Sequence, residues 1–189
     1  MAAASSAQAR LAALPRMGSE KKPFGLGGDE VTSLLNRAKY LSLRHVSEPE
    51  DNSLRLVVEE AIADRTESVS TPDPASPLAE LRKGASPIKS VEGCRAFELQ
   101  WSRYVAYLVT EEGVGSGGSD EDELYTGNLF RLYTKSHFLD HLARDTGGHF
   151  EPILHYKLIC QNHLIDVAAY SPPEVRLLES SGGSRPKPN

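Results

Sequence analysis

The feature that most constrains this chain is the alternation of apolar and polar side chains in two stretches, residues 95–110 and residues 153–170. In the first stretch, Phe97, Leu99 and Trp101 are separated by single polar residues. Successive side chains of a β-strand point to opposite faces of its sheet, so this alternation predicts extended strands that share an apolar interior. A chain with this pattern folds around β-sheets rather than around long helices.

Further strands are predicted from the same alternation and from β-branched and aromatic residues that lie between turn residues. The predicted strands cover residues 40–46, 54–62, 94–101, 104–111, 128–134, 153–161, 163–170 and 174–178. We expect the first two to form one hairpin and the next two to form another, which reverses at Ser102 and Arg103. Segment 174–178 follows two prolines, which favours the edge of a sheet.

Two short helices complete the predicted structure. Residues 29–38 carry apolar side chains at helical spacing behind Asp29, a suitable N-cap, and residues 136–144 form a second helix that ends at a pair of glycines. Strands that are not separated by helices exclude a doubly wound parallel sheet. The expected fold class is therefore mainly β, bordering on α+β. The expected architecture is an antiparallel β-sandwich or a strongly bent sheet of about seven to nine strands.

A length of 189 residues favours a single domain. We expect residues 1–28 to be a flexible extension, residues 29–179 to be one globular antiparallel β domain, and residues 180–189 to be a disordered tail. Two segments rich in Pro, Ser, Gly or acidic residues, 64–90 and 112–126, are predicted as mobile loops within the domain. The second of these loops is acidic, which would let it meet a basic partner by electrostatic steering.

The charge balance disfavours two classes of partner. A formal net charge of −5 argues against nucleic acid, which usually requires a clustered basic face, and against anionic lipid. No apolar run approaches the ~18 residues that span a bilayer. We expect a cytoplasmic protein without a cofactor, in which Cys94 and Cys160 are reduced thiols, with a disulfide as the open alternative. The composition of residues 1–22 is also typical of a transit peptide, so a targeting role stays open.

His137 and His141 lie four residues apart on the second predicted helix, which places both on one helical face. Zinc sites use this spacing, but the catalytic helical motif has Glu after its first His, and Phe138 stands there instead. The apolar side chains of the helix lie on its other face. We interpret the pair as part of a solvated polar face, with a metal site as the weaker alternative.

Asp166 is the most unusual residue of the two C-terminal strands, because both faces of its strand are largely apolar. A carboxylate in such a strand is costly unless it is hydrogen-bonded, so we expect a partner from a neighbouring strand. His155 and His163 are the candidates for an acid–base cluster with Asp166. A relay of Cys160, His163 and Asp166 is conceivable, but no oxyanion hole accompanies it.

Arginine and tyrosine recur on three predicted strands. The set consists of Arg103, Tyr104, Tyr107, Arg131, Tyr133 and Tyr156. These two residue types are enriched at binding hot spots, so the set would form an interaction surface if its members shared one face. The alternative is ordinary cross-strand aromatic pairing inside the sheets.

Three functions are compatible with these patterns. The leading hypothesis is a non-enzymatic binding or accessory protein, with an inhibitor- or immunity-like role among its forms, that binds a protein partner through the Arg/Tyr face. The alternative is a metal-dependent or acid–base enzyme that uses the His and Asp residues. The third is a small-molecule carrier with a cavity between its sheets. No complete catalytic constellation is visible in the sequence, which favours the first.

Overall fold

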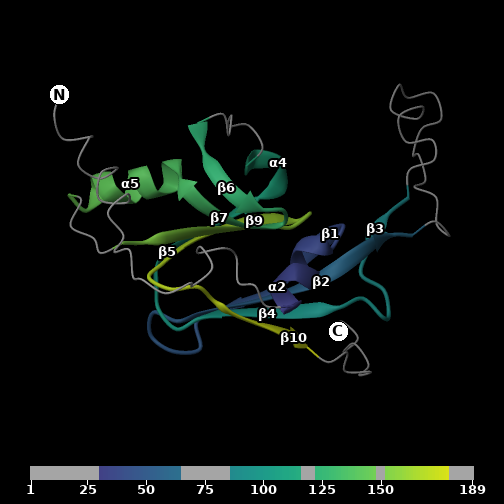
Figure 1. Ribbon diagram of the computed structural model, residues 1–189. Coiled ribbons are helices and arrows are strands. Elements are labelled where there is room, and N and C mark those ends of the chain that lie inside the picture. The colour runs from purple at the N-terminus through teal and green to yellow at the C-terminus, as the bar shows by residue number, and fades with distance from the viewer. Residues whose placement is uncertain (1–29, 65–85, 116–121, 148–151, 179–189) are drawn as a thin grey trace, which may run out of the picture.

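The computed structural model describes residues 30–64, 86–115, 122–147 and 152–178, and within these ranges two antiparallel sheets face each other (Figure 1). The first sheet contains β1 (Tyr40–Ser47), β2 (Leu54–Ala63), β3 (Ile88–Lys89), β4 (Ala96–Trp101) and β10 (Glu174–Leu178). The second contains β5 (Tyr104–Glu111), β6 (Leu124–Gly127), β7 (Phe130–Lys135), β8 (Leu154–Ile159) and β9 (His163–Ala169). The helices are α2 (Glu30–Arg37), α4 (Glu112–Gly115) and α5 (His137–Asp145). This confirms the predicted antiparallel, mainly β architecture.

The strand order explains which strands have free edges. The first sheet runs β1-β2-β4-β10, with β3 paired to the end of β2, and the second runs β5-β9-β8-β7-β6. Strand β10 lies at an edge, as its sequence predicts, and the predicted hairpin β1–β2 is confirmed; β8 and β9 also pair in antiparallel fashion. In the first hairpin Asn52 has a positive φ of 61°, a conformation that Asn tolerates in tight turns.

The predicted hairpin within residues 94–111 is wrong, although both of its strands exist. Strand β4 pairs with β2 and β10 in the first sheet, whereas β5 pairs with β9 in the second. A two-residue hairpin loop requires positive φ, and neither Ser102 nor Arg103 has it. The two residues instead carry the chain from one sheet to the other, and the backbone N–H of Tyr104 bonds to the carbonyl of Asn52 at 2.9 Å.

The core lies between the sheets. Cross-strand register places alternate side chains of each sheet on its inner face, where the packing of buried rings and aliphatic groups is continuous. The largest fully buried members of this core are Trp101, Tyr156, Phe97, Leu35, Leu41, Leu54, Leu56, Leu99, Leu158 and Ile165. Full burial of each such side chain stabilises the fold by roughly 1.5–3 kcal/mol.

Helix α2 packs against this core and fixes the start of β7. Its residue Leu35 is fully buried, as the helical spacing predicts. The side-chain oxygen of Asn36 accepts hydrogen bonds from the backbone N–H groups of Asn128 at 2.9 Å and Phe130 at 3.0 Å. The predicted N-cap, Asp29, lies outside the described residues.

Parts of the predicted loops are regular structure. Segment 64–90 contains β3, and segment 112–126 contains α4 and most of β6. Residues 65–85 and 116–121 of these loops, the extension 1–28 and the tail 180–189 lie outside the described residues. Neither Cys94 nor Cys160 forms a disulfide. None of the helices in the described part of the chain has the length and apolarity that a membrane crossing requires.

Candidate functional site

A continuous set of hydrogen bonds lies on the outer face of the second sheet and links Ser136, His155 and Asp166, here called the polar network. Ser136 directly precedes α5, whereas the other two residues lie on the neighbouring strands β8 and β9. The register pairs His155 with Ala168 and Lys157 with Asp166, so His155 and Asp166 are diagonal neighbours on one face. The structure therefore supplies the partner that the sequence predicts for Asp166.

The hydrogen-bond geometry defines the tautomer of His155. Its Nε2 lies 2.9 Å from Oδ1 of Asp166, and because a carboxylate only accepts hydrogen bonds, Nε2 carries the proton. In the neutral imidazole Nδ1 then accepts from the Ser136 hydroxyl, whose oxygen lies 2.6 Å away. The same oxygen accepts the backbone N–H of Phe138 at 3.1 Å and of Leu139 at 3.3 Å. The Ser136 hydroxyl, both ring nitrogens of His155 and Oδ1 of Asp166 thus all have partners.

The polar network is closed to solvent. The exposed fraction is 3% for Ser136, 1% for His155 and 8% for Asp166. Two rings cover the imidazole: Tyr133 stacks on it with centroids 4.5 Å apart, and Phe138 lies tilted at 5.1 Å. Burial removes competing water, so these hydrogen bonds define the position of α5 on the sheet.

The polar network resembles a catalytic triad in its residue types but differs from one in geometry. In the serine hydrolase arrangement the nucleophile meets Nε2 of the histidine and the carboxylate meets Nδ1. Here the two nitrogens have the opposite partners, and the Ser136 oxygen is already an N-cap that accepts two backbone N–H groups. This arrangement supports a role in positioning the helix rather than in activating Ser136.

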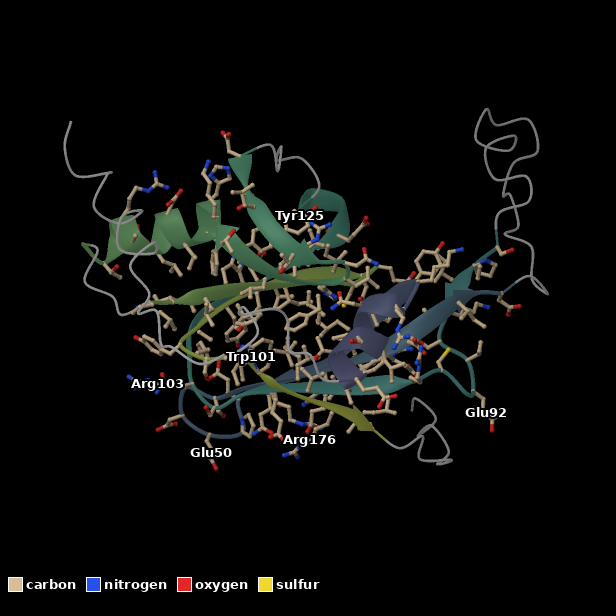
Figure 2. All side chains as sticks on the ribbon, in the orientation of Figure 1. Glu50, Glu92, Trp101, Arg103, Tyr125 and Arg176 are labelled. Atoms are coloured by element: carbon tan, nitrogen blue, oxygen red, sulfur yellow. The ribbon has the colours of Figure 1, made fainter. Side chains whose placement is uncertain are left out.

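An exposed Arg–Tyr cluster adjoins the network; we define it as Leu124, Tyr125, Arg131 and Tyr133. The guanidinium carbon of Arg131 lies 4.1 Å from the ring centroid of Tyr125, and its Nη1 lies 3.5 Å from the Tyr133 hydroxyl. The rings of Tyr125 and Tyr133 are 5.1 Å apart. Figure 2 shows Tyr125 on the outer side of the second sheet, away from Trp101 in the core. The exposed fraction is 60% for Leu124 and 39% for Tyr125.

The Arg–Tyr cluster is continuous with the polar network through one ring. Tyr133 is itself buried, with 2% of its surface exposed, and its ring contacts both the exposed Tyr125 and the buried His155. The register places three cationic side chains on this outer face, namely Arg131, Lys135 and Lys157, with Asp166 as the neighbouring carboxylate. Lys157 is already engaged, because its Nζ lies 3.5 Å from Oδ1 of Asp166. The described strands of this face thus carry three cationic side chains in a chain whose formal net charge is −5.

The structure brings four of the predicted site residues together at one place on the second sheet, and the others lie elsewhere. Those that it brings together are His155, Asp166, Arg131 and Tyr133. His163 lies at the start of β9 opposite Glu111, and its Nδ1 is buried without a hydrogen-bond partner.

His137 and His141 are exposed on α5, on the solvated face that the sequence predicts. His141 Nε2 lies 3.5 Å from Oδ2 of Asp145. Within the described residues no group of three or more histidine, cysteine or acidic side chains has a geometry that could hold a metal ion.

The remaining Arg/Tyr residues do not share the outer face. Tyr156 is buried in the core against Trp101, with ring centroids 5.9 Å apart. Tyr107 packs edge-on against Tyr104 at 5.1 Å and donates its hydroxyl to Glu48 at 3.0 Å. This hydrogen bond raises the pKa of the Tyr107 hydroxyl. The predicted Arg/Tyr face is thus divided among the core, strand β5 and the Arg–Tyr cluster.

Two polar atoms in the core of the described structure have no hydrogen-bond partner. They are Nε1 of Trp101 and the hydroxyl of Tyr156. Burial raises the pKa of the Tyr156 hydroxyl, and burial also raises the pKa of the nearby core thiol of Cys160 to about 12. A thiol with such a pKa is a poor nucleophile at neutral pH, which removes support from a relay through Cys160.

Three residues of the site are absent from the sequence prediction: Ser136, Leu124 and Tyr125. Ser136 was assigned only as the start of a helix, although a serine there has the chemistry of an N-cap that can also serve a buried histidine. The other two lie within the segment 112–126, which the sequence predicts as a loop. The available signal was the Gly127–Asn128 pair between two β-rich runs, which is typical of a hairpin.

Known proteins give no guidance for this chain, since no protein-family model, curated protein or solved structure matches it. Its function therefore has to be inferred from the chemistry of its own side chains. Two features of the second sheet carry that inference: the buried polar network and the exposed Arg–Tyr cluster beside it.

Proposed function

We propose that this chain is a non-enzymatic binding module that recognises an extended, acidic segment of a partner protein with its Arg–Tyr cluster. The observation that carries the proposal is the stacking of Arg131 over the exposed ring of Tyr125, beside an exposed Leu124. Tyrosine and arginine dominate binding hot spots because they combine apolar area with polar groups of fixed direction.

The Arg–Tyr cluster is held in place before any partner arrives. Arg131 is oriented by Tyr125, by Tyr133 and by the Asn128 carbonyl, which accepts from its Nε at 3.1 Å. Tyr133 in turn stacks on the buried imidazole of His155. A side chain that is already ordered loses less conformational entropy on binding, so such an arrangement favours recognition.

Charge supports an acidic partner. The register places Arg131, Lys135 and Lys157 on the outer face of the second sheet, where Asp166 is already paired with His155 and Lys157. A planar guanidinium matches a carboxylate with two parallel hydrogen bonds, and the flanking lysines add attraction at longer range. A basic partner would meet repulsion on this face.

An extended segment fits the free edge beside the cluster. Strand β6 pairs only with β7 among the described strands, and all four of its residues are exposed. A segment that adds to this edge gains main-chain hydrogen bonds, and its alternate side chains face Tyr125 and Arg131. This geometry combines affinity from the backbone with selectivity from the Arg–Tyr cluster.

The test begins with a phage-displayed library of random short peptides selected on the full chain. We expect enrichment of acidic peptides, followed by binding of one synthetic winner in a fluorescence anisotropy titration. Tyr125→Ala and Arg131→Ala should each weaken that binding about tenfold, the effect of losing about 1.4 kcal/mol at a hot spot. The matched control is Arg176→Ala, an exposed arginine on the first sheet, which should bind normally.

Two results would overturn the proposal. One is enrichment of peptides that bind Tyr125→Ala and Arg131→Ala as tightly as the unmodified chain. The other is a single-stranded oligonucleotide that displaces the peptide and depends on the same two residues, which would identify nucleic acid as the occupant. Thermal melts of all variants show whether a loss of binding comes from unfolding.

The acid–base enzyme has less support. His155 and Asp166 meet, but both are buried, and His163 does not join them. General acid–base catalysis requires a group within hydrogen-bond reach of substrate. The buried side chains of the polar network form hydrogen bonds with one another and with the start of α5, rather than facing a surface where substrate could bind.

A further inference from the structure

We propose that strand β5 pairs in antiparallel fashion with β5 of a second copy of this chain, which joins two second sheets into one continuous sheet across a two-fold axis. This inference concerns the edge of the second sheet opposite β6, so it is independent of the peptide site. An antiparallel pair of identical strands is the sheet geometry that satisfies a closed two-fold interface.

Strand β5 lacks the usual protection of an edge. It pairs with β9 alone among the described strands, and it extends over eight residues. Natural edges are blunted by Lys, Pro or short length. The run from Tyr104 to Thr110 contains no charge and no proline. Its irregularity is confined to the start, where the pairing shifts between Tyr104 and Ala106.

Apolar side chains are exposed on both faces of this edge. Leu108 is 50% exposed and its neighbour Val109 is 36% exposed, and they point to opposite faces of the sheet. A strand added alongside would cover both at once, whereas a partner on one face would cover only one. The exposure pattern therefore favours strand addition over packing of a helix on the sheet.

Charge complementarity identifies the added strand as another β5. Arg103 lies exposed just before the strand, with its guanidinium carbon 5.2 Å from the Tyr170 ring centroid. Glu111 and Glu112 lie exposed at the other end. When two copies pair in opposite directions, the arginine end of each lies beside the acidic end of the other. A parallel pairing would place like charges together, which costs stability.

The experiment measures the mass of the full chain by sedimentation over a range of concentrations. We expect a reversible dimer that weakens as ionic strength rises, because the end charges are exposed. Leu108→Lys should abolish the dimer. The matched control is Leu177→Lys, which introduces the same charge at a residue of 44% exposure on β10, the edge of the other sheet, and should dimerise normally.

A charge exchange tests the proposed orientation. Arg103→Glu alone and the double variant Glu111→Lys with Glu112→Lys should each remain monomeric, since each places like charges together at both ends. Mixed in equal amounts, the two variants should form a heterodimer. A monomer at every concentration of the unmodified chain, or a dimer that survives Leu108→Lys, would overturn the inference and leave the peptide site unaffected.

Discussion

The outer faces of the two sheets each hold a carboxylate in a hydrogen-bonded pair, but the two pairs differ in how deeply they are buried. On the first sheet, Arg44 and Glu59 pair across strands close to solvent, with side chains 42% and 28% exposed, although Glu98 in the pair with Arg55 is only 11% exposed. On the second sheet, Asp166 is buried and bonded to His155, with side chains 11% and 2% exposed. Exposed pairs contribute little, whereas breaking a buried pair leaves an unsatisfied group in a dry site. The comparison predicts that the Asp166–His155 pair contributes more to the stability of the fold than the Arg44–Glu59 pair does.

The largest expected effect comes from Asp166→Ala. It leaves Nε2–H of His155 buried without an acceptor, and we expect the free energy of unfolding to fall by about 3 kcal/mol. Urea denaturation provides the measurement. The control on the first sheet, Glu59→Ala, should change stability by less than about 0.5 kcal/mol. If the two variants lost the same free energy of unfolding, the buried pair would contribute no more to stability than the exposed pair, which would contradict the comparison.

Ser136→Ala should have the next largest effect. It removes both the N-cap of α5 and the hydroxyl that donates to Nδ1 of His155, at a cost of about 1–2 kcal/mol. Hydrogen exchange should show the loss first in the amides of Phe138 and Leu139. Ser102→Ala, in the exposed link between the sheets, serves as the control. If α5 kept its full protection in Ser136→Ala, the polar network would not be what holds the helix.

Tyr156→Phe extends the comparison to the core, where we expect the substitution to raise the free energy of unfolding instead of lowering it. The Tyr156 hydroxyl is buried without a partner, so its removal should stabilise the fold by about 1 kcal/mol. The matched variant Tyr133→Phe removes a hydroxyl that does have a neighbour and should give no such gain. A lower melting temperature for Tyr156→Phe would show that this hydroxyl is satisfied in solution.

The smallest effect concerns pH and an ion pair of the first sheet. Hydrogen bonds from Arg95 lower the pKa of Glu60 below its ordinary 4.5. The contribution of ionised Glu60 to the free energy of unfolding is therefore complete above the unfolded-state pKa and is lost as pH falls through the lower folded-state pKa. Because the Arg95 side chain is 38% exposed, solvent screens the pair, and we expect Glu60→Gln to remove only about 0.5 kcal/mol at neutral pH. Urea unfolding from pH 6 to 3 should give converging curves for the two chains, and a constant difference would contradict this assignment.

The strands could be predicted from the sequence because alternation is a local property. Residues 96–101 and 163–169 carry it clearly, and both are strands. Which strand pairs with which is not local. The link at Ser102 and Arg103 has the length of a hairpin turn, yet the chain leaves one sheet for the other there, directly after Trp101 enters the shared core.

The candidate site was predictable in part for the same reason. The need of Asp166 for a partner follows from the apolar character of its strand, and His155 was among the candidates. That His155 is the partner and His163 is not depends on the register of β8 against β9, in which His163 lies at the strand end. The role of Ser136 depends on where α5 crosses the sheet, which no local pattern encodes. Tyr125 was missed because the acidic loop before it masked the short strand β6.

The most direct test of the buried polar network is the protonation of the His155 ring, read by long-range ¹H–¹⁵N correlation spectroscopy. The account predicts a single tautomer with a slowly exchanging proton on Nε2 and an unprotonated Nδ1 that accepts from Ser136. The exposed rings of His137 and His141 provide the internal reference, because their ring protons exchange rapidly with water. A His155 ring that averages between tautomers as those two do would contradict the account.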